Sequence, residues 1–421
     1  MTLNFLECIQ AREGAGLAEC SAACPPPALR APPLPAQNTL PARLLAVVAG
    51  GFVAASAFAV PADGGTTRLQ AQVAGKVIGI QGAPAALPQP SVDSHEAISQ
   101  LLAAPLTNDA AVRIALLNNP ELQSALARAA MGITDWQDTD NLAKRQAQVD
   151  ITVLSARATK AWVQAVASAQ SAQALREAKA TAEATGELAR RMVQAGNLSK
   201  LNQAQHQAKL SEAAMALARA EQAAFAAREQ LIQVLGLWGA QTQFTLMDKL
   251  PALPEAPLEL PDLEAQALAA RTDLGQLMAD WQLKRKPPTT PSDLWDAMGD
   301  AATVRAAAVK LRSQARLAYF NYRSSYDIAQ HLQTQVLPLR KFINDELTLR
   351  YNGMLTSIFD VLADSQAQSQ TVNAATLAAR DFWLAQADLQ ALLAGAPLES
   401  MGSTPGPATN EAAPAASSAG H

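Results

Sequence analysis

The stretch RYNGMLTSIFDVLADSQAQ, residues 350–368, lies between two long runs rich in Ala, Gln and Leu, which are strong helix formers. It contains the dipeptide Asn352-Gly353, a combination that marks tight turns. Leu355 and Ile358 then restore an apolar stripe at helical spacing. The stretch therefore predicts one long helix, a tight turn, and a second long helix that runs back along the first.

Composition extends this prediction to the whole chain of 421 residues. The hydrophobic fraction is 49%, but alanine dominates it and aromatic residues make up only 5%. Small side chains let helices approach closely while each buries little apolar area, which suits long, thin helical assemblies. The formal net charge is -4. The sequence has no stripe of basic residues of the kind that binds nucleic acid. We therefore expect an almost all-α protein that binds no nucleic acid.

The pattern of helix, turn and helix occurs twice in the sequence. Its two occurrences are separated by roughly 150–160 residues, as expected of an internal duplication. Each half predicts a short helix, a long helix, a glycine turn and another long helix. The matching segments are GNLSKL (196–201) with GMLTSI (353–358), IALLNNPEL (114–122) with ALAARTDL (267–274), and LIQVLG (231–236) with LQALLAG (389–395).

The expected long helices are Thr139–Gln194 and Ser199–Val234 in the first half, and Ala301–Tyr351 and Leu355–Ala394 in the second. The first would be roughly 80 Å long, and Pro338 predicts a kink in the third. The hairpins have narrow apolar stripes with broad polar flanks. Such hairpins need neighbours to bury their stripes, so the sequence predicts a homo-oligomer.

The N-terminal region has the features of an export signal. Arg43 precedes the apolar run Leu44–Val60, and Ala57-Phe58-Ala59 fits a secretory cleavage site. This predicts cleavage near Ala59, with an uncleaved N-terminal anchor as the alternative. The only cysteines are Cys8, Cys20 and Cys24, so the fold after them needs no disulfide.

The composition of successive segments predicts the organisation of the chain. Pro-rich and Gly-rich segments separate the repeats from each other and from the two ends. The predicted parts are a leader and signal (1–60), a flexible linker (61–93), the first repeat (94–249), a Pro-rich linker (250–262), the second repeat (263–395) and a disordered tail (396–421).

At residues 94–395 the sequence resembles the TolC-like outer-membrane efflux protein family. The order and spacing of several stretches carry this resemblance, together with the duplication. These stretches are LTNDAAVRIALLNNPELQ (106–123), RRMVQAGNLSKLNQAQ (190–205), LIQVLGLWG (231–239) and VLPLRKFINDELTLRYNGMLTSIFDVLADSQAQ (336–368).

The resemblance implies an outer-membrane channel subunit of a Gram-negative bacterium, which passively exports small molecules or metal ions. It implies a homotrimer whose hairpins form a periplasmic tunnel, with a periplasmic adaptor protein and an inner-membrane pump as partners. It implies neither catalysis nor a cofactor. Carried over by position, the tip residues that face the adaptor are Ala195, Gly196, Asn197, Leu198, Ser199, Tyr351, Asn352, Gly353, Met354, Leu355, Thr356 and Ser357.

The sequence departs from the family pattern at one place in each repeat, where members insert two membrane strands. A membrane strand needs about 9–11 residues with alternating apolar positions. Only TDWQDTDN (134–141) and MADWQLKRKPPTTPSDLWDAMGD (278–300) stand at these places, and neither supplies two such strands. The strands are therefore expected to be largely missing. The alternative function is a soluble periplasmic helical scaffold, or a degenerate member without transport activity.

Charged residues near the two turns are further candidates. Asp360 and Asp364 lie one helical turn apart and would ring a cation-selective constriction if repeated by symmetry, or else lie on a solvated face. Arg190, Arg191 and Arg350 precede the turns. They would form ion pairs between hairpins that hold the tip closed, or simply complement the helix dipole at a C-terminus.

Aromatic residues and histidines complete the candidates. Tyr319, Tyr322 and Tyr326 share one helix face, which predicts packing against the neighbouring hairpin. The histidines are scattered without metal-ligand spacing, so no metal site is predicted. The tryptophans beside the shortened strand positions are interpreted as packing residues, with an interfacial aromatic belt as the alternative; they are Trp136, Trp281 and Trp295.

Overall fold

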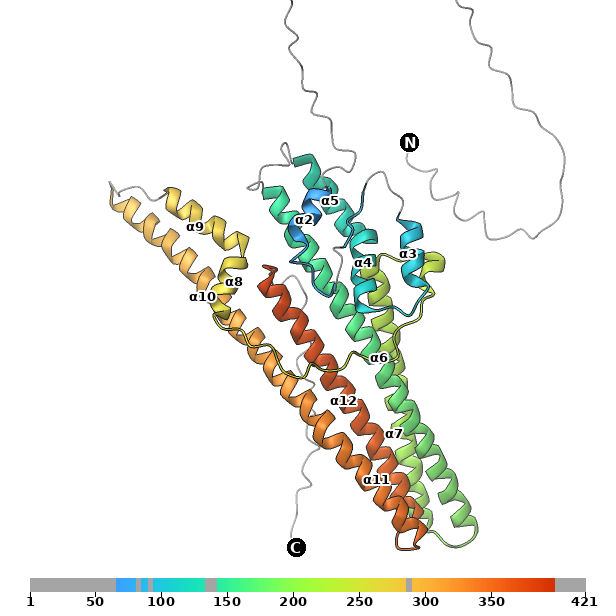
Figure 1. Cartoon of the computed structure of the whole chain (residues 1–421). Helices are drawn as coiled ribbons and strands as arrows, with labels where there is room; N and C mark the ends of the chain where they lie inside the picture. The colour runs from blue at the N-terminus through green and yellow to red at the C-terminus, as the bar shows by residue number, and fades with distance from the viewer. Residues whose placement is uncertain (1–65, 81–84, 90–93, 133–141, 285–289, 398–421) are drawn as a thin grey trace, which may run out of the picture. The chain divides into compact units, whose positions relative to one another are not determined.

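The computed structural model describes residues 66–80, 85–89, 94–132, 142–284 and 290–397. Within these ranges the chain folds into α-helices joined by turns and short extended segments (Figure 1). The described part contains no β-strand, only an isolated bridge between Leu106 and Leu246. The prediction of an all-α protein is confirmed.

The first repeat has the predicted long helix, turn and long helix, but two short helices precede them where the repeat pattern predicts one. Two further short helices, α2 (Thr66–Val73) and α3 (His95–Leu102), come before these helices in the chain, and α3 lies within the predicted range of the first repeat. A short 3₁₀ turn, Gly239–Thr242, follows it. The helices of the repeat are α4 (Asn108–Asn118), α5 (Pro120–Gly132), α6 (Leu142–Gln194) and α7 (Lys200–Leu235).

The second repeat has the same order, with one interruption. A π-turn divides its first long helix into two parts. Its elements are α8 (Leu263–Ala270), α9 (Thr272–Lys284), α10 (Pro291–His331), the π-turn (Leu332–Val336), α11 (Leu337–Asn352) and α12 (Ile358–Leu393).

The repeats correspond in their details as well as in their order. The returning helices α7 and α12 both contain 36 residues, and each begins after a serine N-cap, Ser199 or Ser357. In each repeat the short helices are joined by a single extended residue, Asn119 in the first and Arg271 in the second. The two repeated antiparallel hairpins predicted from the sequence are therefore confirmed.

A glycine closes each repeat in the left-handed backbone conformation. Gly236 has φ 67° and Gly395 has φ 93°. A Cβ atom on Gly236 would lie 2.7 Å from the carbonyl oxygen of Asn118, and one on Gly395 would lie 2.3 Å from that of Ala270. Each glycine thus lets the end of the returning helix approach the end of the first short helix.

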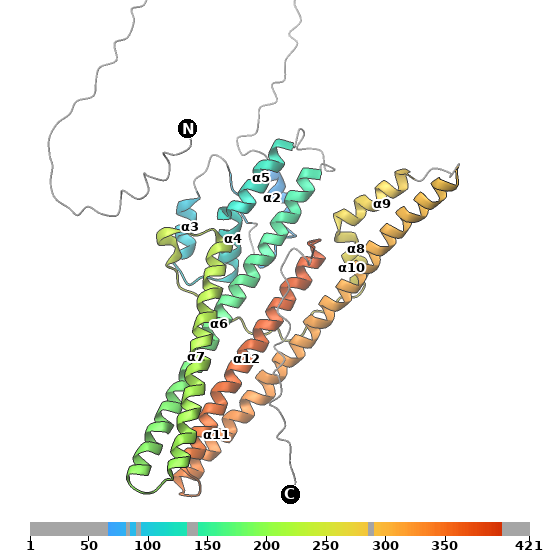
Figure 2. The same cartoon turned by 180° about the vertical axis from the view of Figure 1, so that it is seen from behind.

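The long helices pack in the order α7, α6, α12, α10–α11. Helix α6 contacts both α7 and α12, and α12 also contacts α10 and α11. Figures 1 and 2 show this order from opposite sides for the part of the helices away from the tips, whereas α7 lies between α6 and α12 near the tips. The α6–α7 and α11–α12 turns lie at the same end. Away from the tips the two hairpins are therefore joined through α6 and α12, which leaves α7 and α10 at the two edges.

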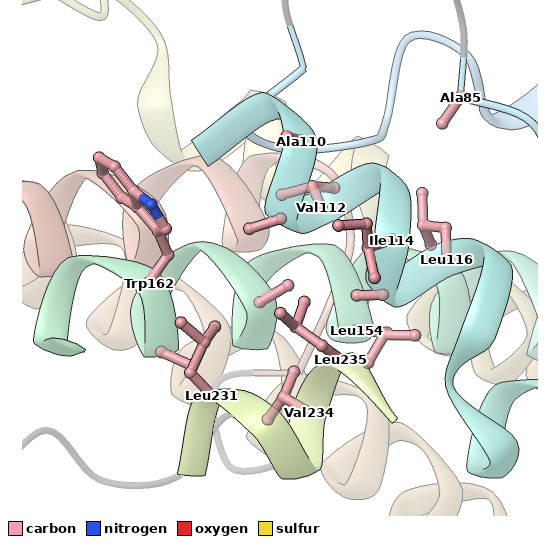
Figure 3. Close-up of a cluster of buried hydrophobic side chains, with 14 of the residues drawn as sticks. Ala85, Ala110, Val112, Ile114, Leu116, Leu154, Trp162, Leu231, Val234 and Leu235 are labelled. Carbon is pink, nitrogen blue, oxygen red and sulfur yellow. The ribbon is translucent and has the colours of Figure 1, made fainter. Parts of the chain in front are cut away.

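The first repeat has its hydrophobic core where α4 crosses α6 and α7. Ile114 and Leu116 of α4, together with Leu231 and Leu235 of α7, are fully buried there (Figure 3). Trp162 of α6 lies in the same cluster, and its Nε1 donates a hydrogen bond of 2.7 Å to the carbonyl oxygen of Leu106. The base of the first hairpin is thus the best-packed part of that repeat.

The second repeat has a separate core built around Phe382 of α12. The ring centroids of Tyr322 and Tyr326 lie 5.5 and 5.6 Å from that of Phe382. The Tyr322 hydroxyl accepts a hydrogen bond from the Leu258 amide at 2.9 Å, and the Tyr326 hydroxyl donates to the Glu255 carbonyl at 2.9 Å. These tyrosines therefore pack within their own hairpin and hold the Pro-rich linker, which corrects the prediction that they face the neighbouring hairpin.

The predicted flexible linker, residues 61–93, contains an ordered helix. Leu69 and Val73 of α2 are buried and pack into the core of the first repeat. Further along, the amide of Ile78 donates a hydrogen bond of 3.2 Å to the Ser155 hydroxyl. The prediction was wrong for Thr66–Val73 because it weighed Gly and Pro content and overlooked the one-turn spacing of Leu69 and Val73.

The third of the predicted long helices begins earlier than predicted, because α10 starts at Pro291 rather than at Ala301. Thr290 and Asp293 form a capping box, in which the Thr290 hydroxyl accepts from the Asp293 amide and the Asp293 carboxylate accepts from the Thr290 amide. Most of the second stretch assigned to a missing strand is therefore helical. Trp295 lies there and is 69% exposed, so it is not a packing residue of this chain.

The predicted kink at Pro338 takes the form of the π-turn. Proline has no amide hydrogen to donate to the carbonyl four residues earlier, and its ring crowds that carbonyl. Just before it, the Leu337 amide donates to the Leu332 carbonyl, five residues back, as a π-turn requires. The helix therefore absorbs the proline by local widening.

Several predictions fall on other parts of the chain. The leader and signal, Trp136 and the first shortened strand position lie outside the described residues, as does the tail from residue 398. None of the helices in the described ranges combines the length and the hydropathy needed to cross a lipid bilayer.

The contact between the two hairpins includes a largely buried ion pair. Lys160 Nζ of α6 lies 2.9 Å from Asp388 Oδ1 of α12, and the two side chains are 13% and 18% exposed. Replacing Asp388→Ala leaves a poorly solvated ammonium group, so we expect the free energy of unfolding to fall by about 1–3 kcal/mol. Chemical denaturation measures this change.

The matched control for this prediction is Glu221→Ala. Glu221 pairs with Arg176 at 2.9 Å, but both side chains are about half exposed. Exposed ion pairs contribute roughly 0–1 kcal/mol, so the control should change stability far less. Equal losses in the two variants would contradict a special role for the buried pair.

Candidate functional site

The turn between α6 and α7 forms the tip of the first hairpin. The amide of Asn197 donates to the Met192 carbonyl at 2.8 Å, and the amide of Gly196 donates to the Val193 carbonyl at 3.0 Å. Gly196 has φ 78°, so this is a Schellman ending with glycine in the left-handed position. The Ser199 hydroxyl then accepts from the Asn202 amide at 3.2 Å and begins α7.

The turn between α11 and α12 has the same geometry with different residues. The amide of Leu355 donates to the Arg350 carbonyl at 2.8 Å, and the amide of Met354 donates to the Tyr351 carbonyl at 2.9 Å. The left-handed residue is Met354, with φ 59°, whereas Gly353 has φ -82°. The sequence paired Gly196 with Gly353, but the structure pairs Gly196 with Met354.

The two tips differ in what they expose. Met354 and Leu355 are 94% and 80% exposed, so the second tip ends in two exposed apolar side chains. A non-glycine residue in the left-handed region costs roughly 1–2 kcal/mol. At the first tip, Gly196 and Asn197 are exposed without a large apolar side chain. The second tip therefore carries most of the exposed apolar surface.

The predicted tip residues are brought together at one end of the two hairpins. Figures 1 and 2 show both turns at the same end of the long helices. Most of them are exposed, and only Leu198 and Thr356 are half-buried. The arrangement offers apolar and backbone groups to a docking partner.

The arginines near the turns pair within their own helices. Arg190 and Arg191 both bind Glu187 on α6, the latter at 2.8 Å. The hydrogen bond from Arg191, and to a smaller extent the one from Arg190, lowers the pKa of the Glu187 carboxyl. Arg350 pairs with Glu346 on α11 at 3.4 Å. Within this chain the three arginines therefore pair with an acid about one turn away on the same helix, and their role in closing an assembled tip stays a prediction.

The two aspartates after the second turn also have structural partners. Asp360 closes the capping box of α12, and its Oδ2 accepts from the Ser357 amide at 3.1 Å. Asp364 is buried, and its carboxylate accepts from Asn344 at 3.2 Å and from Arg340 at 3.4 Å. Asp364 therefore lies on neither a solvated face nor an open constriction of this chain, because α11 covers it.

A ring contact near the tips joins the two hairpins. The imidazole of His206 on α7 stacks on the Phe359 ring of α12, with centroids 4.9 Å apart and planes at 18°. Burial, with a smaller contribution from Lys209, lowers the pKa of His206. This contact could not be predicted from the sequence, because no local pattern indicates how α7 lies against α12.

The outer face of α10 carries a long apolar stripe. Its large side chains are exposed and lie on one face of the helix. Phe320 lies about three helical turns after Val309, and Ile328 lies about three turns after Leu317. Buried Leu311 and Ala315 lie on the opposite face of the helix. The exposed residues of the stripe are Trp295, Met298, Val309, Leu317, Phe320 and Ile328.

Comparison with known proteins gives similar structures only. No protein-family model and no curated protein matches the sequence. A crystal structure of CusC, studied for folding and transmembrane channel formation, is 14% identical; the match covers 72% of this chain and 96% of CusC, with a TM-score of 0.49.

Two outer-membrane channels are similar in the same way. OprN is 15% identical over 72% of this chain and 91% of its own, with a TM-score of 0.45. The CmeC channel of Campylobacter jejuni is 12% identical over 75% of this chain and 91% of its own, with a TM-score of 0.43. The chain is thus similar to channel proteins, and its fold class rests on the two repeated hairpins described above.

Proposed function

We propose that this chain is the subunit of an outer-membrane efflux channel that works in a tripartite export system. Three copies form a periplasmic helical tunnel through which small molecules or metal ions pass without catalysis. The hairpin tips meet a periplasmic adaptor protein, which connects the channel to an inner-membrane pump. The main support for this proposal is the pair of repeated hairpins, whose exposed tips lie at one end of the long helices.

The apolar stripe on α10 supports assembly into a trimer. Contiguous apolar faces are rarely left in water, and they mark contacts with other proteins. Away from the tips, the long helices have two edges, α7 and α10. A second copy that brings its α7 edge against the α10 edge buries the stripe, and repetition of this contact closes a ring.

Negative charge placed on the stripe is expected to break the assembly. Combining Leu317→Glu and Phe320→Glu puts carboxylates at two positions that are 60% and 68% exposed in the single chain. Stability of the single chain should change little, whereas association should weaken by at least about tenfold. Sedimentation velocity across a concentration series measures both mass and affinity.

Gln330→Glu is the matched control for this experiment. Gln330 is exposed on the same helix, to one side of the stripe. It adds charge without entering the proposed interface and should leave the assembly intact. A wild-type chain that stays monomeric at all concentrations would refute the channel proposal.

Envelope fractionation tests the proposed location. Full-length protein with a C-terminal tag should sediment with the outer membrane and resist carbonate washing. Recovery in the soluble periplasm would instead favour the helical scaffold without transport activity.

A further inference from the structure

The Asn352-Gly353 pair at the second tip is not explained by backbone geometry. Gly353 has φ -82° and ψ 5°, a conformation that any residue adopts. A Cβ atom at this position would meet nothing closer than 3.6 Å, which is ordinary contact. The left-handed residue of the turn is Met354 instead. The shape of the turn therefore does not require glycine at position 353.

We propose that Asn352 is a site of spontaneous deamidation at the exposed hairpin tip. A glycine after asparagine leaves the following amide nitrogen unhindered. That nitrogen attacks Cγ of Asn352, the bond from Cγ to Nδ2 breaks, and ammonia leaves with the proton from the Gly353 nitrogen. Water then opens the five-membered imide to an aspartate or isoaspartate at position 352. The reaction needs only water.

The helix end controls how fast this reaction runs. The Gly353 amide donates a hydrogen bond of 3.0 Å to the Leu349 carbonyl, which holds its nitrogen away from attack. Asn352 is the last residue of α11 and is exposed. Final helical turns fray, and each opening frees the amide. The modification rate therefore reports how often the last turn of α11 opens.

Deamidation would change the chemistry of the tip. It replaces a neutral amide with a carboxylate beside the apolar pair Met354 and Leu355. It also places negative charge at a helix C-terminus, where the dipole disfavours it. The tip would pass from a neutral apolar surface to an anionic one as the protein ages. This inference does not depend on the proposed channel function.

The first tip supplies a comparison within the same molecule. Asn197 is also exposed in a turn, but Leu198 follows it and its side chain hinders attack. We would incubate the full chain at mildly alkaline pH and map its peptides by mass spectrometry over days. The peptide with Asn352 should gain about 1 Da per molecule, while the peptide with Asn197 stays unchanged.

Gly353→Ala tests the role of the glycine directly. Alanine fits the observed backbone, so the fold should persist, as circular dichroism would verify. The added methyl group should slow conversion by roughly tenfold or more. Equal rates at Asn352 and Asn197, or an unchanged rate in the alanine variant, would overturn the proposal.

Discussion

Gly395→Ala should lower the free energy of unfolding by about 2–4 kcal/mol, as a sum of backbone strain and overpacking. The residue has φ 93°, which a side chain disfavours. Its added Cβ would also lie 2.3 Å from the Ala270 carbonyl oxygen, and this neighbour is backbone. The end of α12 would have to move away from α8. Denaturant titration followed by circular dichroism measures the loss.

Substitutions at two other glycines distinguish the cost of backbone strain from the cost of steric crowding. Gly196 has φ 78° but nothing within 4 Å of a built Cβ, so Gly196→Ala should cost only the strain, roughly 1 kcal/mol. Gly353 has neither feature, and Gly353→Ala should be nearly neutral. Similar losses at all three glycines would show that close approach at the repeat end does not matter.

Phe382→Ala is the second substitution with a large expected effect, a loss of about 3–5 kcal/mol. The side chain is 0% exposed and lies at the centre of the second core. Its ring is 5.1 Å from Trp383 and contacts both buried tyrosines. Removing it leaves a cavity that long helices cannot easily close. Thermal unfolding should show a lower midpoint, and the near-ultraviolet signal should weaken.

Phe225→Ala is the matched control, because Phe225 on α7 is 66% exposed. It removes the same atoms from a surface position, so the stability of the single chain should change by less than about 1 kcal/mol. A small effect of Phe382→Ala would contradict the assignment of the second core.

Sequence patterns predicted the features that depend on neighbours in the chain. Helix formers gave the long helices, and the tip turns were placed correctly. Ser199 and Ser357 cap the returning helices because a hydroxyl at that position satisfies a free amide, which places the start of α12 at Ile358 rather than at the predicted Leu355. The duplication was visible because matching segments recur at one offset along the chain, including those that end in Gly236 and Gly395.

Features that depend on distant partners were not predictable. Asp364 becomes buried only because α11 lies over it, and His206 meets Phe359 only through the packing of two hairpins. The position of the left-handed residue in the second turn was also not predictable from the local sequence. The matching segments pair Gly353 with Gly196, but the helix continues through Asn352 and Met354 takes the left-handed conformation. The proposed roles of the tip residues remain predictions.

The π-turn has a consequence for how other helices can lie along this chain. One residue inserted into a helical ladder rotates everything beyond it by about 100°. In an uninterrupted helix, Ile328 and Leu339 would share a face, since about three turns separate them. The inserted residue therefore predicts that exposed apolar residues of α11, such as Leu339, lie about a quarter turn away from the stripe on α10. A neighbouring helix packed along the stripe on α10 cannot stay on one continuous apolar face as far as the tip. The helices α10 and α11 therefore present separate contact faces.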